Sequence, residues 1–371
     1  MKQPELYIGV MSGTSMDGVD TALVRIAGDN IELLAHDEYP MPETLKNDLL
    51  AICIGQKTDL KTVGEIDHQL GHLFAEAVLQ LLDKSNTEAS KITAIGNHGQ
   101  TVFHQPTGEQ PFTMQLGDAN IIATRTGIDT VADFRRKDMA LGGQGAPLVP
   151  AFHSTIFSPK TSTVVALNIG GISNISVLRP NNKVLGYDTG PGNMLMDAWG
   201  QRHTGNKFDK DAGFAKQGLV NVQLLEALLK EGYFSKPAPK STGRELFNLP
   251  WLENKLKTFD KVSAQDVQRT LCEFTAVTIA NEVLLYQLGD SPELLVCGGG
   301  GHNPLLMTRL AELLPQWQVA STNSKGVDAD YMEAMAFAWL AQRRMHGLNS
   351  NLPEVTGASQ LASLGVIYPK N

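Results

Sequence analysis

The chain has 371 residues, of which 42% are hydrophobic and 19% charged, a composition typical of globular proteins and long enough for two domains. A formal net charge of −8 gives no electrostatic basis for binding nucleic acid or an anionic membrane, and no apolar run is long enough to cross a bilayer. The first residues lack the pattern of a signal peptide, and the 3 cysteines are scattered without a CxxC pair, so we expect a cytoplasmic location. Glycine is over-represented, at 35 residues, and needs local explanations because it destabilises regular elements.

The N-terminal half alternates strand-like and helix-like segments. β-Prone runs bounded by turn residues predict strands at 6–10, 21–26, 30–39, 92–97 and 128–132. Apolar residues at helical spacing predict a long amphipathic helix over 66–81, with further helices at 41–50 and 117–126. The glycine-rich segment 142–147 is expected to be a loop.

The C-terminal half continues the alternation. Strands are expected at 163–169, 172–178, 184–187, 293–296 and 317–320. Helices are expected from 193 to 199, from a capping box at Ser263 and Asp266 onward, and over 332–340. The stretch 205–250 contains three prolines and is the least regular part of the chain.

One pattern recurs: a strand followed by a turn rich in glycine with serine, threonine or asparagine. It occurs at 9–20, 168–174 and 186–193, and in a glycine-only form at 298–303. The first two copies both lie between consecutive strands. Two similarly built lobes with a cleft between them would account for this repetition.

The segment 9–20 reads GVMSGTSMDGVD and is the densest of these turns. Backbone N–H groups of a tight glycine turn bind anions, and Thr14 and Ser15 add hydroxyl donors, so the segment favours phosphate binding. Asp17 and Asp20 could orient a hydrated Mg²⁺ or the turn itself. The alternative is an ordinary β-hairpin turn. Neither GxxxxGK[ST] nor a GxGxxG that opens a helix is present, so the common phosphate motifs are excluded.

Two later glycine segments extend this interpretation. The turn 168–174 is either a second phosphate-facing turn or a plain hairpin. The run Gly298–Gly301 follows a strand and would let the backbone approach a flat ligand, although a flexible linker would have the same composition.

Asp188, at the end of a strand, is the best candidate for a general base, and the alternative is that it caps the following helix. His98, Gln100 and Thr101 follow a strand as a polar group typical of a cleft lining. The cations of segment 133–138 either form a solvated loop or clamp an anionic substrate group.

Two other features carry weaker signals. His68 and His72 resemble a zinc motif, but Gln69 stands where its glutamate would be, so a zinc protease is disfavoured. Glu333 lies beside the apolar stripe of the last helix, where a surface position is the default.

Together these features resemble the actin/hexokinase/Hsp70-type ATPase architecture, and within it the 1,6-anhydro-N-acetylmuramic acid kinase family. The segments that carry the resemblance are 9–20, 96–104, 115–123, 131–153, 167–176, 186–199, 297–303 and 332–341. The implied fold is an α/β, two-lobed actin-like ATPase built from duplicated ribonuclease H-like domains with an interlobe cleft. The lobes would span 1–160 and 161–371, with the final helix packing back on the first lobe.

The resemblance implies that ATP, Mg²⁺ and water convert 1,6-anhydro-N-acetylmuramic acid into N-acetylmuramic acid 6-phosphate and ADP during cell-wall recycling in the cytoplasm. A homodimer is implied as well. The alternatives from the same superfamily are a conventional sugar kinase and a non-enzymatic, chaperone-like ATPase.

The resemblance also assigns roles to residues. Asp188 would be the general base, and Arg135 would hold the lactyl carboxylate of the sugar, with its neighbour Arg136 as the alternative. The other sugar-binding residues would be His98, Gln100, Thr101 and Glu333. The nucleotide-binding residues would be Gly13, Thr14, Ser15, Met16, Asp17, Gly18, Val19, Asp20, Asn168, Gly170, Gly171, Gly298, Gly299, Gly300, Gly301 and Asn303. No metal ligand is assigned.

Overall fold

The computed structural model describes residues 3–13, 16, 18–53, 55–259 and 261–371. The chain divides into two compact units: the first combines residues 1–156 with 331–371, and the second spans Phe157–Asp330. The expected division assigned 161–371 to the second lobe, with the final helix packing back on the first. In the structure the second unit ends at Asp330, and the whole of 331–371, the final helix included, belongs to the first unit.

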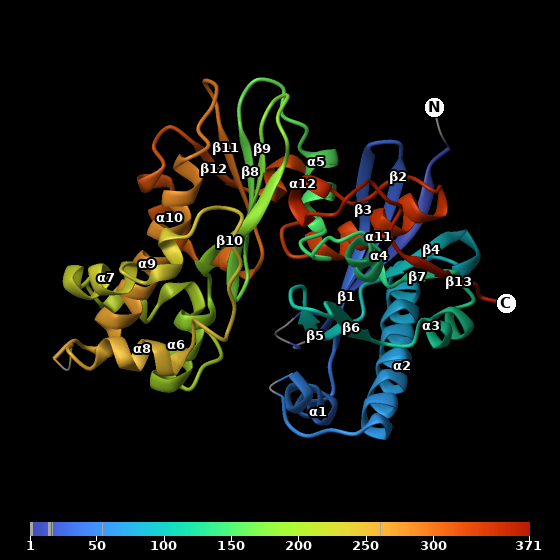
Figure 1. The fold of residues 1–371 in the computed structure, drawn as a ribbon, viewed down its shortest axis with the longest axis horizontal. Helices are drawn as coiled ribbons and strands as arrows, with labels where there is room; N and C mark the ends of the chain where they lie inside the picture. Colours follow the sequence, from blue (N-terminus) through green and yellow to red (C-terminus); the bar gives the residue numbers. More distant parts are fainter. Residues whose placement is uncertain (1–2, 14–15, 17, 54, 260) are drawn as a thin grey trace. The chain divides into compact units, whose positions relative to one another are not determined.

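The first unit is built on a six-stranded sheet in the order β13-β7-β4-β1-β2-β3 (Figure 1). Its strands are β1 (Glu5–Met11), β2 (Gly18–Ala27), β3 (Asn30–Pro40), β4 (Ile92–Asn97), β7 (Thr130–Ala132) and β13 (Val366–Tyr368). The first three form an antiparallel meander, whereas β4 runs parallel to both β1 and β7. A separate hairpin consists of β5 (Gln100–Gln105) and β6 (Phe112–Leu116).

Helices cover both faces of this sheet. The helices of the first unit are α1 (Glu43–Cys53), α2 (Leu60–Lys84), α3 (Ala119–Thr126), α4 (Phe134–Ala140), α5 (Val149–Ile156), α11 (Met332–Met345) and α12 (Pro353–Thr356). Ile8 and Val10 share a buried cluster with Phe74 of α2. Because successive strand residues point to opposite faces, Gly9 between them faces the other way, where α11 packs on β1 and β4.

Glycine lets α11 approach the sheet closely. A Cβ atom on Gly9 would lie 1.7 Å from the carbonyl oxygen of Ala334, and one on Gly96 would lie 2.0 Å from that of Phe337. Gly9 begins the segment 9–20, which we expected to bind phosphate, but what approaches Gly9 itself is the backbone of α11. The same helix approaches Gly96, so these two glycines serve packing.

The second unit repeats the strand order of the first. Its strands are β8 (Val164–Ile169), β9 (Ile172–Leu178), β10 (Leu185–Pro191), β11 (Glu293–Cys297) and β12 (Gln318–Ser321), in the order β10-β9-β8-β11-β12. An antiparallel meander is again followed by two strands parallel to its first strand. The order β3-β2-β1-β4-β7 of the first unit has the same arrangement, so the expected duplication of a ribonuclease H-like sheet is confirmed.

The helices of the second unit lie mainly between β10 and β11 in the chain. They are α6 (Met194–Thr204), α7 (Val222–Leu229), α8 (Leu249–Leu256), α9 (Ala264–Leu284) and α10 (Pro304–Leu313). As the capping-box pattern predicted, α9 begins after Ser263, whose hydroxyl oxygen accepts a hydrogen bond from the Asp266 N–H at 3.1 Å. Short 3₁₀ turns occur at Ala89–Lys91, Lys210–Ala212, Ala215–Gln217, Gly232–Ser235, Gly299–His302 and Thr322–Lys325.

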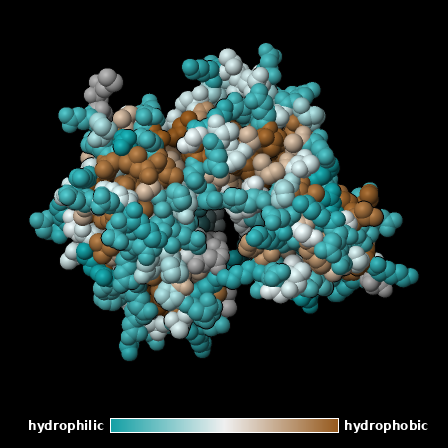
Figure 2. Space-filling model, turned by 180° about the vertical axis from the view of Figure 1, so that it is seen from behind, coloured by the Kyte–Doolittle hydropathy of each residue, from teal (hydrophilic) through white to brown (hydrophobic). Residues whose placement is uncertain are grey.

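The surface agrees with the composition. In the view of Figure 2, hydrophilic side chains cover most of the visible face and hydrophobic ones form separate patches. Among the residues that the structure describes, no helix is long and apolar enough to span a membrane.

Candidate active site

In the first unit, the polar residues expected to bind substrate follow β4. His98 is 6% exposed, and its Nε2 accepts hydrogen bonds from Nη2 and Nε of Arg135 at 2.8 and 3.2 Å. Because Nε2 accepts, the ring proton is assigned to Nδ1. Burial, and secondarily the charge of Arg135, hold the pKa of His98 well below its ordinary value. His98 is therefore a neutral imidazole at physiological pH.

Arg135, at the start of α4, is tied to the glycine-rich loop as well as to His98. Its Nη1 donates to the carbonyl oxygen of Gly145 at 2.8 Å. Burial lowers the pKa of Arg135 to about 10, against the opposing effects of Glu333 and Asp138. Arg135 thus remains a cation at neutral pH, held in a fixed orientation.

A buried carboxylate supports this loop. Oδ2 of Asp138 accepts from the Gly145 N–H at 2.9 Å, and its Oδ1 accepts from Asn351 Nδ2 at 3.0 Å and Thr356 Oγ1 at 2.9 Å. The C-terminal segment therefore helps to fix the loop on which the orientation of Arg135 depends.

Glu333 lies in the first turn of α11 and is partly buried rather than on an open surface. Burial raises the pKa of its carboxyl group, and the nearby charge of Arg135 acts in the opposite direction. The close packing of α11 at Gly9 and Gly96 thus brings a carboxylate from the end of the chain next to Arg135.

The turn between β1 and β2 contacts the hairpin that follows His98. Ser12 Oγ donates to Gln100 Oε1 at 2.6 Å, a fully buried bond. Thr101 Oγ1 accepts from Gln115 Nε2 at 3.2 Å. Both predicted side chains, Gln100 and Thr101, therefore have defined positions beside the first glycine turn.

The first glycine turn is described in part. Gly13 accepts the N–H of Met16 at 3.2 Å, and Met16 is buried with φ of 55°. Gly18, Val19 and Asp20 begin β2, where Asp20 pairs with Met11. The predicted nucleotide-binding residues Thr14, Ser15 and Asp17 lie outside the described residues.

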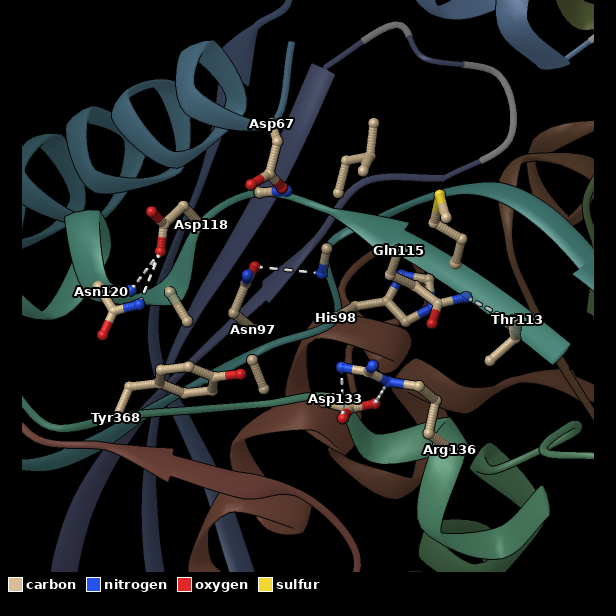
Figure 3. A pocket seen from close by; sticks show the side chains of 16 residues that line it. Asp67, Asn97, His98, Thr113, Gln115, Asp118, Asn120, Asp133, Arg136 and Tyr368 are labelled. Atoms are coloured by element: carbon tan, nitrogen blue, oxygen red, sulfur yellow. Dashed lines mark hydrogen bonds and ion pairs between the residues drawn. The ribbon is translucent and has the colours of Figure 1, made fainter. Parts of the chain in front are cut away.

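A cavity of about 310 Å³ opens beside these residues within the first unit (Figure 3). Asn97 and His98 line it, and each is at least nine-tenths buried. Among the described residues, neither Asn97 Nδ2 nor His98 Nδ1 has a hydrogen-bond partner. Unpaired buried donors are costly, and a polar ligand or water in the cavity would satisfy both.

Arg136 also lines this cavity, but its environment differs from that of Arg135. It is exposed, and its Nε donates to Asp133 Oδ1 at 2.8 Å. The two adjacent arginines are thus distinct: Arg135 is partly buried and oriented by His98, and Arg136 belongs to a local surface ion pair.

In the second unit, Asp188 lies within β10 and is held at several points. Its N–H donates to the carbonyl oxygen of Lys240 at 3.0 Å, and its Oδ2 accepts from the Thr242 N–H at 3.0 Å. Burial raises the pKa of Asp188 to about 6; the Thr242 N–H opposes this rise and the charge of Glu245 adds to it. The N-cap of α6 is Asn193, so Asp188 is not the capping residue of that helix.

The second glycine turn connects β8 to β9. Its carbonyl oxygens are occupied: Gly170 accepts the Asn193 N–H at 2.8 Å and Gly171 accepts the Gly192 N–H at 2.9 Å. Asn168 lies at the end of β8, beside the turn. These bonds hold the turn against the start of α6.

The late glycine run forms a 3₁₀ turn between β11 and α10, and its residues differ in what they contact. A Cβ on Gly298 would lie 2.3 Å from Asn168 Oδ1, and one on Gly300 would lie 2.2 Å from Ile169 Cγ2. These two glycines therefore permit close packing on the end of β8. Asn303 Oδ1 caps α10 by accepting from the N–H groups of the first turn at 3.1 Å.

Four glycines of these two turns face open space: Gly170, Gly171, Gly299 and Gly301. A Cβ added to any of them would meet only one atom within 4 Å, and that atom would be at least 3.5 Å away. A ligand approaching the backbone has room there.

Sequence reasoning missed the segment that contacts Asp188. Lys240 and Thr242 fall in the proline-containing stretch that matched nothing recognisable. The only available signal was the run KPAPKSTG at 236–243, in which a lysine, small hydroxyl residues and a glycine follow two prolines.

Two units with the same ribonuclease H-like strand order, glycine turns at strand ends and a strand-borne carboxylate define a two-lobed α/β fold of the actin/hexokinase type. A model of the anhydro-N-acetylmuramic acid kinase family matches residues 5–370. The anhydro-N-acetylmuramic acid kinase of Vibrio parahaemolyticus is 71% identical over 371 residues, covering 100% of both chains. That of Pasteurella multocida is 56% identical, covering 100% of this chain and 98% of the relative.

Among solved structures, a ROK family glucokinase from Streptomyces griseus aligns with a TM-score of 0.41 and 13% identity, covering 91% of this chain and 99% of that one. The sequence matches are sufficient by themselves: the chain belongs to the anhydro-N-acetylmuramic acid kinase family, and it is a phosphotransferase with an alcohol acceptor.

Proposed function

We propose that this kinase uses ATP and water to convert 1,6-anhydro-N-acetylmuramic acid into N-acetylmuramic acid 6-phosphate and ADP, as part of peptidoglycan recycling in the cytoplasm. The names of its relatives support the substrate. The single observation that supports the chemistry is Asp188: a carboxyl group with a pKa of about 6, one oxygen of which accepts from Thr242 N–H. A base with a pKa near the operating pH is suited to take a proton from water.

In this mechanism Asp188 takes a proton from the water that attacks the anomeric carbon. The new bond joins water oxygen to C1, and the C1–O6 bond of the anhydro bridge breaks. O6 takes the electron pair of that bond and attacks the γ-phosphorus, and the bond to ADP breaks. O6 is captured by phosphorus, so no separate acid is required for the leaving oxygen.

The first unit supplies the sugar-binding groups in this proposal. Arg135 provides a fixed cation for the lactyl carboxylate, and neutral His98 provides an Nδ1–H donor beside the cavity. Gln100, Thr101 and Glu333 would bind the polar groups of the sugar. Because His98 is neutral, the pair adds one positive charge to the site rather than two.

ATP would contact the glycine turns of both units. Gly170, Gly171, Gly299 and Gly301 leave open space beside the backbone, which fits a bound nucleotide. The remaining assigned residues are Gly13–Asp20, Asn168, Gly298, Gly300 and Asn303. Gly298 and Gly300 would act by setting the shape of the turn, since their α-carbons pack on β8.

Mg²⁺ would accompany ATP and neutralise charge on its phosphates. Among the described residues, no three His, Cys, Asp or Glu side chains are grouped as a metal site. Mg²⁺ needs no such group, because it keeps several waters and usually takes one or two carboxylates besides the phosphates. Of the two carboxylates in segment 9–20, Asp20 is the one among the described residues, and it would lie nearest the phosphates in this proposal.

The decisive experiment is turnover of the purified anhydro sugar with ATP in ¹⁸O-water. The proposed reaction places the label on C1 of the phosphorylated product. A phosphorylated product with the anhydro ring intact would instead indicate a conventional sugar kinase. ATP hydrolysis stimulated by unfolded polypeptide, and by no sugar, would indicate a chaperone-like ATPase. Sedimentation of the same preparation would test the proposed homodimer.

The pH dependence of kcat/KM should show an acid limb near pH 6. Asp188 acts when deprotonated, so activity is expected to fall as the pH decreases through its pKa of about 6 and to be level above it. His98 is neutral throughout this range and contributes no limb. Burial also raises the pKa of Glu333 and of Asp67. Loss of the limb in Asp188→Asn, but not in Glu333→Gln or Asp67→Asn, assigns it to Asp188. A limb near pH 4 would contradict the raised pKa.

Arg135→Lys is expected to raise the KM for the sugar by about tenfold or more, because an ammonium cannot bond His98 Nε2 and the Gly145 carbonyl together in the geometry of a guanidinium. The KM for ATP should change little. Arg136→Lys is the matched control, since Arg136 is exposed and paired with Asp133. A larger effect from Arg136→Lys than from Arg135→Lys would transfer the carboxylate-binding role to Arg136.

A further inference from the structure

Lys240 is a buried lysine in a segment without regular structure. It is 8% exposed, and its Nζ lies 2.6 Å from Glu282 Oε1 of α9. The ammonium also lies 5.1 Å from the centre of the Tyr233 ring and 3.4 Å from the carbonyl oxygen of Phe234. Burying an ion pair is costly, and well-packed apolar side chains are often as stable, so stability alone does not account for this pair.

Glu282 extends the network to the strand that carries Asp188. Its second oxygen, Oε2, accepts from the hydroxyl of Tyr187 at 2.9 Å. Tyr187 immediately precedes Asp188 in β10. The same carboxylate therefore contacts both the Lys240 ammonium and the residue that precedes the candidate base in β10.

The backbone around Lys240 contacts Asp188 directly. The Lys240 carbonyl oxygen accepts from the Asp188 N–H, and two residues later the Thr242 N–H donates to Asp188 Oδ2, both at 3.0 Å. Tyr233, whose ring lies under the Lys240 ammonium, donates from its hydroxyl to the Asp188 carbonyl oxygen at 2.6 Å. Asp188 is thus held through its N–H, its carbonyl oxygen and one carboxylate oxygen.

The other carboxylate oxygen is left available. No described residue donates a hydrogen bond to Oδ1 of Asp188. Because Thr242 holds Oδ2 in place, Oδ1 is the oxygen that can accept a proton, and its orientation is set by the same hydrogen bond.

We propose that Lys240 is a positioning residue: its buried ion pair with Glu282 anchors segment 236–245 so that Thr242 N–H holds Asp188 Oδ2 and Oδ1 faces the substrate water. This inference rests on the proposed function, in which Asp188 is the base. Lys240 itself does not touch the reacting atoms.

The test is the double variant Lys240→Met/Glu282→Gln, which removes both charges together and so leaves no unpaired buried ion. We expect kcat to fall by about tenfold or more, as misplacement of a catalytic group does. The KM for the sugar and the affinity for ADP, measured by calorimetry, should stay within about twofold. Lys255→Met/Glu231→Gln is the matched control, because it removes another ion pair of the same unit, with 3.3 Å between its charged atoms, and should keep kcat.

Combination with Asp188→Asn separates positioning from a general structural effect. If Lys240 acts through Asp188, the double variant causes little further loss of kcat once the base is absent. If the double variant lowered kcat by the same factor in the Asp188→Asn background as in the wild type, the inference would be overturned. An unchanged kcat in the double variant alone would also overturn it.

Two further measurements complete the test. Glu282→Gln alone leaves Lys240 beside a neutral hydrogen-bond acceptor, so it provides a test even if the double variant folds poorly. We expect its kcat to be about threefold lower than that of the wild type. An unchanged kcat in this folded variant would count against the proposal. Normal turnover in Asp188→Asn by itself would overturn the proposed function and this inference with it. Lost turnover in Asp188→Asn with normal turnover in both Glu282 variants would overturn the positioning role alone.

Discussion

Asp188→Asn is expected to lower turnover by about 10²- to 10⁴-fold, the range usual for loss of a general base. Asparagine retains the shape of the side chain and can still accept the Thr242 N–H bond through its amide oxygen. It cannot take a proton from water. Binding of ADP should therefore be retained, and the measurement is kcat for labelled product together with calorimetric ADP affinity.

The same substitution should not weaken the fold. Burial raises the pKa of Asp188 to about 6 in the folded protein, above the unfolded value of about 3.9, so the folded state binds the proton more tightly. Stability from this group is therefore greatest below pH 4 and is lost as the pH rises through 6. At pH 8 a neutral asparagine should match or exceed the stability of the wild type, by about 1 kcal/mol after allowance for partial solvent screening.

Asp211→Asn is the matched control for this variant. Asp211 is exposed, lies in the second unit and has a φ of 55°, a conformation that asparagine tolerates well. It should leave turnover unchanged. Near-normal turnover in Asp188→Asn would remove Asp188 from the mechanism, and a large drop in its melting temperature at pH 8 would contradict the raised pKa.

Much of the fold could be predicted because each core strand ends at a recognisable turn. β8, for example, is an almost continuous apolar run, and Gly170 and Gly171 separate it from β9, which is rich in β-branched residues. The hairpin of β5 and β6 was missed because its outward positions carry exposed apolar residues such as Phe103 and Met114, which blur the alternation. β13 is too short, at 3 residues, to give any period.

The candidate site was predictable where chemistry is concentrated in a short segment, and not where it depends on distant contacts. Asp188 stands out beside its glycine turn, but nothing local indicates that Thr242 donates to it or that Lys240 reaches Glu282. Likewise, a glycine that admits a ligand and one that admits a helix look alike in the sequence. Gly299 and Gly96 differ only in what the fold brings to them.

Gly96→Ala is expected to be the most destabilising of the substitutions considered. The new Cβ would lie 2.0 Å from the carbonyl oxygen of Phe337 and 3.1 Å from the Ala341 Cβ, so α11 would have to move away from β4. Overpacking usually costs 1–3 kcal/mol, and a clash with the backbone of α11 should exceed about 3 kcal/mol. For a protein of 371 residues, with an unfolding entropy of about 2.1 cal/mol/K per residue, 3 kcal/mol corresponds to a melting temperature lower by about 4 °C.

The displaced helix also carries Glu333, so the variant should raise the KM for the sugar more than that for ATP. Gly64→Ala is the matched control: Gly64 is an exposed position inside α2 where an added Cβ meets nothing within 4 Å. There alanine should raise stability by about 0.5–1 kcal/mol, because glycine is the poorer helix former. Equal effects of the two substitutions would mean that α11 does not depend on the glycine contacts at the sheet. We expect Gly96→Ala to lower the free energy of unfolding and Gly64→Ala to raise it, and only Gly96→Ala to raise the KM for the sugar. That result would attribute the glycine at position 96 to packing rather than to nucleotide binding.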